Sequence, residues 1–187
     1  TKLFDLKNNL YAFEEVSNLI LNYYVLSRKS NLAFTANLIY RIPVLYPDIL
    51  KYKNINFKEW YQDIFNQYYY KEYLPARDIV YEGKGRSVII YLHSIGYEQQ
   101  PDGVIMILIN NQKVRDILSN LSSSEGGWAS ILDARDQVLS STAPDDISVK
   151  ELLSGMDSRN GNIQRKINGE KYLISYLTSS FNDWRYV

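Results

Sequence analysis

The first 27 residues carry apolar side chains at alternating intervals of three and four positions. With one serine in the series, these are Leu3, Leu6, Leu10, Phe13, Ser17, Ile20 and Tyr24. This is the spacing of a heptad seam along one helix face, and no Gly or Pro interrupts it. The pattern predicts a long N-terminal helix whose apolar face either packs on its own domain or pairs with a second protomer.

Two further segments show a helical pattern before residue 80. Asn31–Ile42 is compatible with a second helix, which the prolines at 43 and 47 would end. Asn56–Tyr70 places its aromatic residues on one helical face, and Asn56 and Glu59 have the spacing of a capping box. The sequence therefore predicts a short amphipathic helix that begins near Asn56.

From residue 79 onward the apolar residues alternate with period two, which is typical of strands. A Gly-Lys-Gly turn indicates one hairpin, and Asn168-Gly169 indicates another because both residues tolerate positive φ. Ser122–Gly127 is the best linker candidate. The fold class is α+β, with short helices at Lys113–Leu121 and Ser148–Leu153 and strands at Ile79–Glu82, Val88–Ile95, Val104–Asn110, Trp128–Asp133, Gln137–Ser141, Asn162–Ile167, Lys171–Tyr176 and Trp184–Val187.

Composition and charge narrow the classes of function. Of the 187 residues, 45 % are hydrophobic and 22 % charged, as is usual in globular proteins. The 21 Lys and Arg balance the 21 Asp and Glu, which argues against nucleic-acid binding. The chain has no cysteine, which excludes disulfides and thiolate metal sites. The 17 tyrosines suit half-buried sheets and the walls of binding sites.

The sequence contains no recognisable catalytic constellation. His93 is the single histidine, which is too few for a histidine-based metal site, and no Gly-x-Ser-x-Gly elbow accompanies it. Asp145 and Asp146, with Asp133 and Asp136, could form a carboxylate-only calcium site, but their spacing is not that of a calcium loop. Solvated turns and helix caps explain these residues better. We expect no catalytic residue, no bound metal and no cofactor.

Three segments in order carry a resemblance to a known family. They are Ser87–Ile95 followed by Asp102–Ile109, then Gly127–Ser141, and then Tyr172–Tyr176 with Ser179-Ser180 and Trp184–Val187. Together they resemble the extracellular Cache-type sensor domains of bacterial transmembrane receptors. The resemblance is closest to the double Cache domains of AraC-type transcriptional regulators and sensor histidine kinases of Gram-positive bacteria.

The resemblance implies PAS-like modules, each a curved antiparallel sheet flanked by helices. It divides the chain into a long helix (1–27), a membrane-distal module (28–121) and a membrane-proximal module (122–187). Residues 28–55 show no clear strand-turn-strand, which implies a reduced distal module or a single module with a helical cap. Where the family has Gly in the turn after Asp133, this chain has Asp136, which tolerates left-handed φ.

The resemblance also implies a site. Amino-acid-binding members of the family share an Arg-x-Trp-Tyr element, whose nearest match here is Lys58-Glu59-Trp60-Tyr61. Lys keeps the charge of Arg but lacks its bidentate fork. Tyr91 and His93 share a parity on one strand, so they point to one face of the sheet. The candidate ligand-binding residues are therefore Lys58, Trp60, Tyr61, Tyr91 and His93.

The expected function is the sensing of a small solute or an extracellular protein. The resemblance places the domain outside the cell and tethers it by transmembrane helices beyond this sequence. It also implies a homodimer through the N-terminal helix and no direct contact with nucleic acid. The alternative is an extracytoplasmic protein–protein interaction domain without a small ligand. A closed apolar core favours this alternative, whereas convergent polar groups in a cavity favour the sensor.

Overall fold

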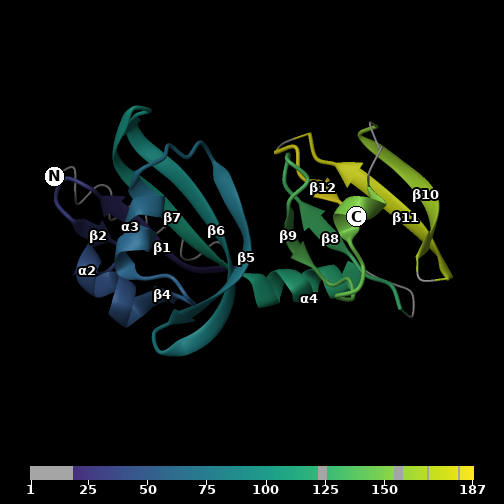
Figure 1. The fold of residues 1–187 in the computed structure, drawn as a ribbon, viewed down its shortest axis with the longest axis horizontal. Helices are drawn as coiled ribbons and strands as arrows, with labels where there is room; N and C mark the ends of the chain where they lie inside the picture. The colour runs from purple at the N-terminus through teal and green to yellow at the C-terminus, as the bar shows by residue number, and fades with distance from the viewer. Residues whose placement is uncertain (1–18, 122–125, 154–157, 168, 181) are drawn as a thin grey trace. The chain divides into compact units, whose positions relative to one another are not determined.

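The computed structural model describes residues 19–121, 126–153, 158–167, 169–180 and 182–187 (Figure 1). The chain divides into two compact units between Asn111 and Gln112. Each unit is built on one antiparallel sheet with few helices, so the sheet-based PAS-like class is confirmed. The division of the chain at residues 27 and 121 stays a prediction.

In its described residues, unit 1 is a seven-stranded antiparallel sheet with three short helical segments. Its strand order is β3-β2-β1-β7-β6-β5-β4, and each strand pairs antiparallel with its neighbours. The elements are β1 (Ile20–Ser27), β2 (Leu32–Phe34), β3 (Ile39–Arg41), α2 (Ile42–Val44), η1 (Leu45–Ile49), β4 (Leu50–Tyr52), α3 (Phe57–Phe65), β5 (Glu72–Tyr81), β6 (Lys84–Tyr97) and β7 (Gln100–Asn110).

The predicted N-terminal helix is wrong over its last turns, because Ile20–Ser27 forms strand β1. This strand pairs with β7 from Ile20 to Ser27, with one bulge near Asn22. Aromatic and β-branched side chains fit a strand better than a helix here, and the apparent heptad positions in this stretch are those of a half-buried strand. Residues 1–18 of the predicted helix lie outside the described residues.

The second predicted helix, Asn31–Ile42, is also wrong. Asn31 adopts a φ of +56° and turns the chain after β1, a conformation that Asn tolerates. The chain then forms β2 and β3, which pair from Leu32 with Arg41 to Phe34 with Ile39. A strand-turn-strand, β1–β2, is therefore present among the described residues, and it begins inside the segment predicted as helix.

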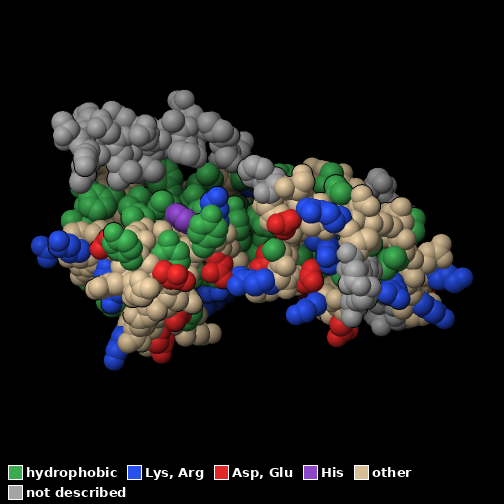
Figure 2. Space-filling model, turned by 90° about the horizontal axis from the view of Figure 1, so that it is seen from above, with side chains coloured by type: hydrophobic (Ala, Val, Ile, Leu, Met, Phe, Trp, Pro, Cys, Tyr) green, Lys and Arg blue, Asp and Glu red, His purple; other side chains and the backbone are tan. Residues whose placement is uncertain are grey.

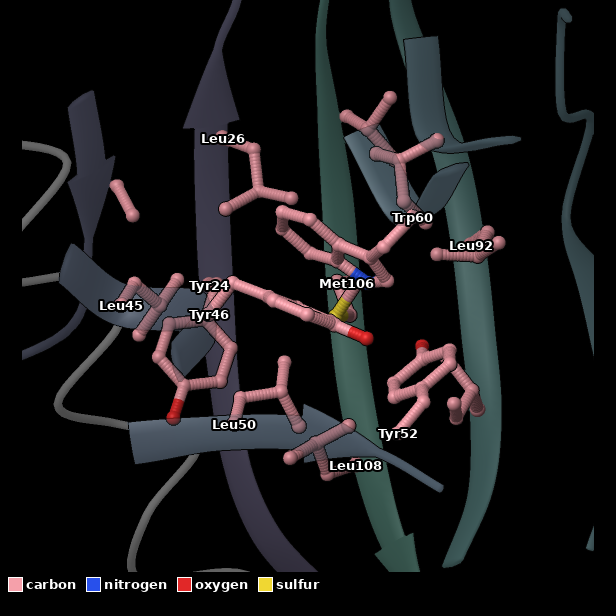
Figure 3. Close-up of a cluster of buried hydrophobic side chains, with 14 of the residues drawn as sticks. Tyr24, Leu26, Leu45, Tyr46, Leu50, Tyr52, Trp60, Leu92, Met106 and Leu108 are labelled. Carbon is pink, nitrogen blue, oxygen red and sulfur yellow. The ribbon is translucent and has the colours of Figure 1, made fainter. Parts of the chain in front are cut away.

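The core of unit 1 lies on one face of the sheet, under α3 and the α2–η1 segment, and the edge strand β4 contributes Leu50 and Tyr52 to it. Figure 3 shows its centre, where side chains from β1, β7 and β6 meet those of the covering segments. Burying one large apolar side chain contributes about 1.5–3 kcal/mol. The largest side chains that are fully buried are Trp60, Tyr24, Tyr46, Phe65, Leu26, Ile42, Leu45, Leu50, Ile79, Ile90, Leu92 and Met106.

Unit 2 is a five-stranded antiparallel sheet with the order β10-β11-β12-β8-β9. The Asn-Gly hairpin predicted between its two longest strands is confirmed, with Ile167 opposite Glu170 and Gly169 at a φ of +92°. The elements are α4 (Asn111–Leu121), β8 (Ser130–Leu132), β9 (Val138–Ser141), α5 (Val149–Leu152), β10 (Asn160–Ile167), β11 (Glu170–Thr178) and β12 (Arg185–Tyr186).

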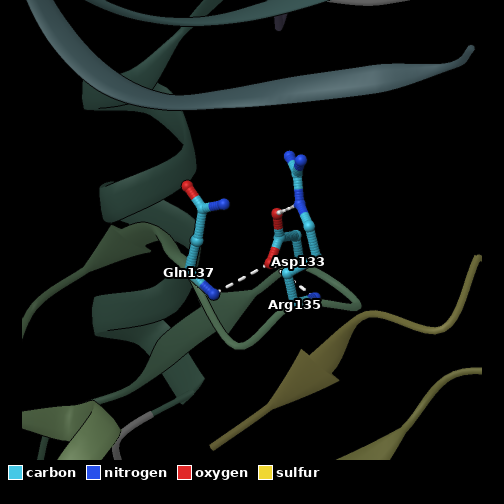
Figure 4. A network of polar contacts seen from close by, with 3 residues as sticks. All are labelled: Asp133, Arg135 and Gln137. Atoms are coloured by element: carbon cyan, nitrogen blue, oxygen red, sulfur yellow. Dashed lines mark hydrogen bonds and ion pairs between the residues drawn. The ribbon is translucent and has the colours of Figure 1, made fainter.

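The turn between β8 and β9 is held by a buried carboxylate. Asp133 Oδ1 accepts the backbone N–H groups of Arg135 and Gln137, each at 2.8 Å (Figure 4). Asp136 adopts a φ of +58°, as expected for the residue in the place of Gly, and its carboxylate pairs with Arg185 at 3.0 Å. Asp133 and Asp136 thus stabilise a turn.

Candidate functional site

Helix α3 positions the central residue of the site. Its N-terminus has the predicted capping box: Glu59 N–H donates to the Asn56 side chain, and Asn56 N–H donates to the Glu59 carboxylate, each at 3.0 Å. The helix then buries Trp60, Ile64 and Phe65 on one face. Fixing the first turn in this way sets the direction in which Trp60 enters the core.

Trp60 lies at the centre of an aromatic cluster and is 1 % exposed. Its indole stacks on Tyr46 with ring centres 4.7 Å apart, and the ring centre of Phe57 lies 6.3 Å from that of Trp60 and 6.1 Å from that of Tyr46. The Tyr46 hydroxyl donates to the Ile55 carbonyl at 2.6 Å. The polar group of Tyr46 is therefore satisfied, which is the usual state of a buried polar atom.

Three other polar atoms of this cluster have no hydrogen-bond partner among the described residues. They are the hydroxyl of Tyr24 on β1, the hydroxyl of Tyr52 on β4 and the indole N–H of Trp60 on α3. Figure 3 shows all three directed toward the centre of the cluster, near Met106. We call these three groups the donor cluster. Each unpaired buried polar group lowers the stability of the folded state by about 1–3 kcal/mol. Three such groups in one cluster are therefore candidates for a functional rather than a stabilising role.

The environment keeps both tyrosines neutral. Burial is the largest cause that raises the pKa of Tyr24, and the neighbouring Tyr81 hydroxyl adds to it. The Tyr81 hydroxyl accepts a hydrogen bond from Asn22 Nδ2 at 2.7 Å. Burial likewise raises the pKa of Tyr52. Both hydroxyls therefore keep their protons at physiological pH and remain able to donate.

A positive charge lies beside the donor cluster. The guanidinium of Arg77 on β5 is 5.4 Å from the centre of the Tyr52 ring, and its Nε is buried without a partner among the described residues. The Trp60 indole N–H and, less strongly, the charge of Arg77 lower the pKa of Tyr52 against the larger effect of burial, so both groups lie near its hydroxyl, although no hydrogen bond of normal geometry joins Tyr52 to Trp60. Together these groups offer several donors and one cation to a hydrogen-bond acceptor.

The five residues predicted from the sequence are not brought together. Trp60 belongs to the donor cluster, and Tyr61 packs beside it, with its ring 4.7 Å from that of Phe65. Lys58 is exposed on the outer side of α3. On β6, Ile90 and Leu92 face the core, so the alternating positions of Tyr91 and His93 lie on the opposite face of the sheet.

Tyr91 and His93 do share one face, as their parity indicates, and they form a second aromatic group there. Tyr91 lies 4.9 Å from Tyr73, and His93 lies 5.9 Å from Tyr70. His93 Nδ1 accepts the backbone N–H of Lys71 at 3.3 Å. Figure 2 shows hydrophobic side chains gathered around the histidine. This group is separate from the donor cluster because the sheet lies between them.

Sequence reasoning missed Tyr24, Tyr52 and Arg77. Tyr24 stood in a segment predicted as helix, and Tyr52 and Arg77 stood in stretches without a clear pattern. In the sheet order, β7, β6 and β5 separate β1 from β4, so these tyrosines approach one another only across the sheet face. No local sequence pattern indicates that residues so far apart in the chain lie close together in the fold. Within the described residues, no group of His, Asp and Glu could hold a metal ion.

Comparison with known proteins identifies the fold. No family model and no curated protein matches the chain. The extracellular domain assigned to the histidine kinase rpHK1S-Z16 has a TM-score of 0.60 and 12 % identity, covering 100 % of this chain and 76 % of that one. The corresponding domain of soHK1S-Z6 has a TM-score of 0.56 and 14 % identity, covering 97 % and 74 %.

A chemoreceptor domain has a somewhat lower structural similarity to this chain. The ligand-binding domain of Pseudomonas fluorescens CtaA, solved with L-leucine, has a TM-score of 0.52 and 15 % identity, covering 94 % of this chain and 71 % of that one. None of the described helices is long and apolar enough to cross a membrane. The chain therefore has the Cache-like fold found in the extracellular sensory domains of histidine kinases and chemoreceptors.

Proposed function

We propose that the chain is the extracellular ligand-sensing domain of a transmembrane signalling receptor, without a catalytic role. The observation that carries this proposal is the donor cluster, in which three buried polar atoms lack partners. Such atoms destabilise the empty protein and favour a ligand that accepts their hydrogen bonds. The fold supports the proposal, because the solved structures that share it are sensory domains.

The ligand class we propose is a small solute with a carboxylate. Trp60 Nε1 and Arg77 Nε can only donate hydrogen bonds, and the hydroxyls of Tyr24 and Tyr52 can donate as well. A carboxylate accepts several such bonds through two oxygens, and bonds to a charged group are roughly twice as strong as neutral ones. L-leucine, the solute in the CtaA structure, carries this group.

Ligand entry requires the aromatic cluster to rearrange. Trp60 and Tyr46 are almost fully buried and stacked, so the arrangement described here is packed by the protein's own rings. We propose a second, more open arrangement of α3 that binds the ligand more tightly than the closed one. The ligand then shifts the population toward the open arrangement, by an amount set by the difference between its two affinities. We propose that this population shift is the sensing step. We further propose that the domain is a homodimer, whose N-terminal segments transmit the change toward the membrane.

The cytoplasmic output follows from the sequence resemblance. We propose that it is an AraC-type transcriptional regulator or a histidine kinase of a Gram-positive bacterium. The reading frame that surrounds the coding sequence tests this proposal. Membrane helices on both sides, followed by either output domain, would support it. A frame without membrane helices would exclude a transmembrane receptor of any kind.

A thermal-shift screen tests the ligand class. The panel pairs small carboxylates, including amino acids, with their neutral amides and adds polyamines and sugars. A ligand at about 100 times its Kd stabilises the native state by roughly 2.7 kcal/mol, which raises Tm by several degrees. We expect responses from carboxylates alone, and a smaller rise in Tm for the Tyr52→Phe variant, because it binds the ligand more weakly. A response to the amides of equal size would contradict the assigned ligand chemistry.

A protein–protein interaction domain is the second candidate. Two aromatic side chains on unit 1 favour it, since Tyr70 is 71 % and Tyr97 81 % exposed, and interfaces are enriched in tyrosine. Substitution of both by serine should abolish capture of such a partner while Tm stays unchanged. Failure of every solute in the screen, together with loss of capture in this variant, would favour this candidate over the sensor.

A further inference from the structure

The buried interior of unit 1 offers hydrogen-bond donors to a ligand but no carboxylate. Among its described residues, the buried polar side chains other than tyrosine and tryptophan are Ser94 and Asn111. Both are engaged elsewhere, since Ser94 Oγ accepts the backbone N–H of Tyr69 at 2.9 Å and Asn111 Nδ2 donates to Ser87 Oγ at 3.0 Å. A positively charged group on a ligand would therefore find no buried anion here.

The acidic residues outside this interior act only weakly on the donor cluster. Glu82 is exposed, and its charge is the smallest of the effects that raise the pKa of Tyr24. Asp63 and Glu72 both raise the pKa of Tyr69. Neither of them is among the charges that shift the pKa of the two donor-cluster tyrosines. The electrostatic environment of the cluster is thus set mainly by its donors and by the neighbouring cation.

That cation, Arg77, is not neutralised by a carboxylate of the described part of the chain. Its guanidinium lies 5.4 Å from the centre of the Tyr52 ring, and its Nε is buried without a hydrogen-bond partner. None of the ion pairs between described residues includes it. The carboxylate of the adjacent Asp78 pairs with Lys53 instead, at 3.0 Å. The site therefore has one positive charge that a ligand can neutralise.

This charge distinguishes between two kinds of carboxylate. A carboxylate without an amino group carries one net negative charge and neutralises Arg77. A zwitterionic amino acid is neutral overall, so the positive charge of the site would remain. Its ammonium group would also be buried with three N–H donors, no acceptor capacity and no anionic partner. Burial of an unpaired charge is strongly unfavourable, so the amino acid should bind more weakly.

The remainder of the ligand faces apolar side chains. Leu50, Leu92, Met106 and Leu108 are fully buried in the same cluster, and Figure 3 shows them around the rings that carry the donor groups. A second polar group on the ligand would lose its water there without gaining a hydrogen-bond partner. A hydrocarbon tail loses nothing on entering such surroundings and gains from the burial of its surface.

We infer that the donor cluster binds an apolar monocarboxylate that has no amino group. The inference rests on the proposed function and narrows its ligand class, because it excludes free amino acids. The carboxylate accepts hydrogen bonds from the donor cluster and lies beside the Arg77 guanidinium, while the hydrocarbon tail packs among the apolar side chains. Selection against the ammonium group then comes from the lack of a buried acceptor.

Calorimetric titration with three matched compounds tests this inference. Isocaproate is L-leucine without its amino group, and isocaproamide is the corresponding neutral amide. We expect isocaproate to bind more tightly than L-leucine by about tenfold or more, because only leucine buries an ammonium group. We expect no saturable binding of isocaproamide, which lacks the negative charge.

The three compounds separate failure of this inference from failure of the proposed function. Binding of L-leucine as tight as that of isocaproate, with no binding of the amide, would overturn the selection against amines and leave a carboxylate sensor intact. Binding of the amide as tight as that of isocaproate would overturn both, because the site would then not recognise a carboxylate. Binding of none of the three would also count against both.

Substitution of Arg77 tests the origin of the selectivity. In Arg77→Gln we expect isocaproate to bind about tenfold more weakly, with a smaller change for L-leucine, because the neutral site no longer favours a net anion. Arg77→Lys keeps the charge and should keep the preference for isocaproate. Lys51→Gln removes an exposed cation on β4 and should change neither affinity. Circular dichroism establishes that each variant is folded. An unchanged ratio of the two affinities in folded Arg77→Gln would overturn the assigned role of Arg77, and should that variant not fold, loss of the preference in Arg77→Lys would do so.

Discussion

At the scale of single residues, tyrosines in the same core differ in whether their hydroxyl has a partner. The hydroxyl of Tyr46 donates to Ile55 O, and that of Tyr69 donates to Asp63 O. Those of Tyr24 and Tyr52 have no partner among the described residues. A ring in this core stabilises the fold through burial, whereas an unpaired hydroxyl opposes it. The two effects can be separated by removing the hydroxyl alone.

We expect Tyr24→Phe and Tyr52→Phe each to raise the free energy of unfolding by about 1–3 kcal/mol, because each removes an unpaired buried group. The matched control is Tyr46→Phe, which removes a satisfied hydroxyl and should lower stability by about 0.5–1.5 kcal/mol. Urea denaturation of the three variants measures the difference. A loss of stability in the first two, equal to that of the control, would show that their hydroxyls are paired.

The same tyrosines predict instability at alkaline pH. Burial holds the pKa of Tyr24 and Tyr52 in the folded protein well above the ordinary value of 10. Above pH 10 the unfolded chain loses these protons while the native state keeps them, so stability falls as pH rises. Each tyrosine contributes a slope of about 1.4 kcal/mol per pH unit. Denaturation at pH 9 to 11 should show a shallower fall in Tyr52→Phe than in the wild type.

Gly103 on β7 is predicted to tolerate no side chain. A Cβ at this position would clash with the backbone carbonyl oxygen of Leu26 on β1, so the two strands would have to separate. We expect Gly103→Ala to lower stability by about 1–3 kcal/mol. Gly85→Ala on β6 is the control, because a Cβ there meets nothing within 4 Å. Equal Tm values for both variants would contradict the close approach of β1 and β7.

At the scale of elements, the capping box of α3 fixes the first turn of the helix and thereby the orientation of the Trp60 side chain in the core. Asn56→Ala removes the side-chain acceptor of the Glu59 N–H and should cost about 1 kcal/mol. It should also alter the fluorescence of the buried Trp60, whereas Lys58→Ala, on the exposed side of the same helix, should leave both properties unchanged. An unaltered Tm in Asn56→Ala would show that packing alone holds the helix.

Elements with a strong local signal could be predicted from the sequence. The capping box identified α3, the Asn-Gly turn identified the β10–β11 hairpin, and period-two alternation identified β6 and β7. Strand β1 could not be predicted in this way, because a half-buried strand of eight residues, Ile20–Ser27, matches a heptad at two positions. Its pairing with β7 is a long-range contact, and such contacts override local propensity.

The candidate site was predictable only in part. Trp60 was found because it lies in a motif on a capped helix. Tyr24, Tyr52 and Arg77 come from three strands that share no local pattern, and their convergence depends on the order of strands in the sheet. Tyr91 and His93 were correctly placed on one face, but the sequence does not show which face covers the core. Face assignment requires knowledge of what packs on each side.

At the scale of the whole molecule, each of the two units is built on one antiparallel sheet. The donor cluster, whose buried polar atoms lack partners among the described residues, lies in unit 1. Substitutions in unit 2 that leave unit 1 folded should therefore leave the response to a solute unchanged.

The most direct test of the central claim is calorimetric titration of the best carboxylate from the screen into three proteins. We expect saturable binding to the wild type and to Tyr46→Phe, and binding weaker by at least tenfold in Tyr52→Phe, because only the last variant loses a hydroxyl of the donor cluster. A tenfold loss corresponds to about 1.4 kcal/mol. Equal affinity for all three proteins would place the ligand elsewhere and remove the donor cluster as the sensing site.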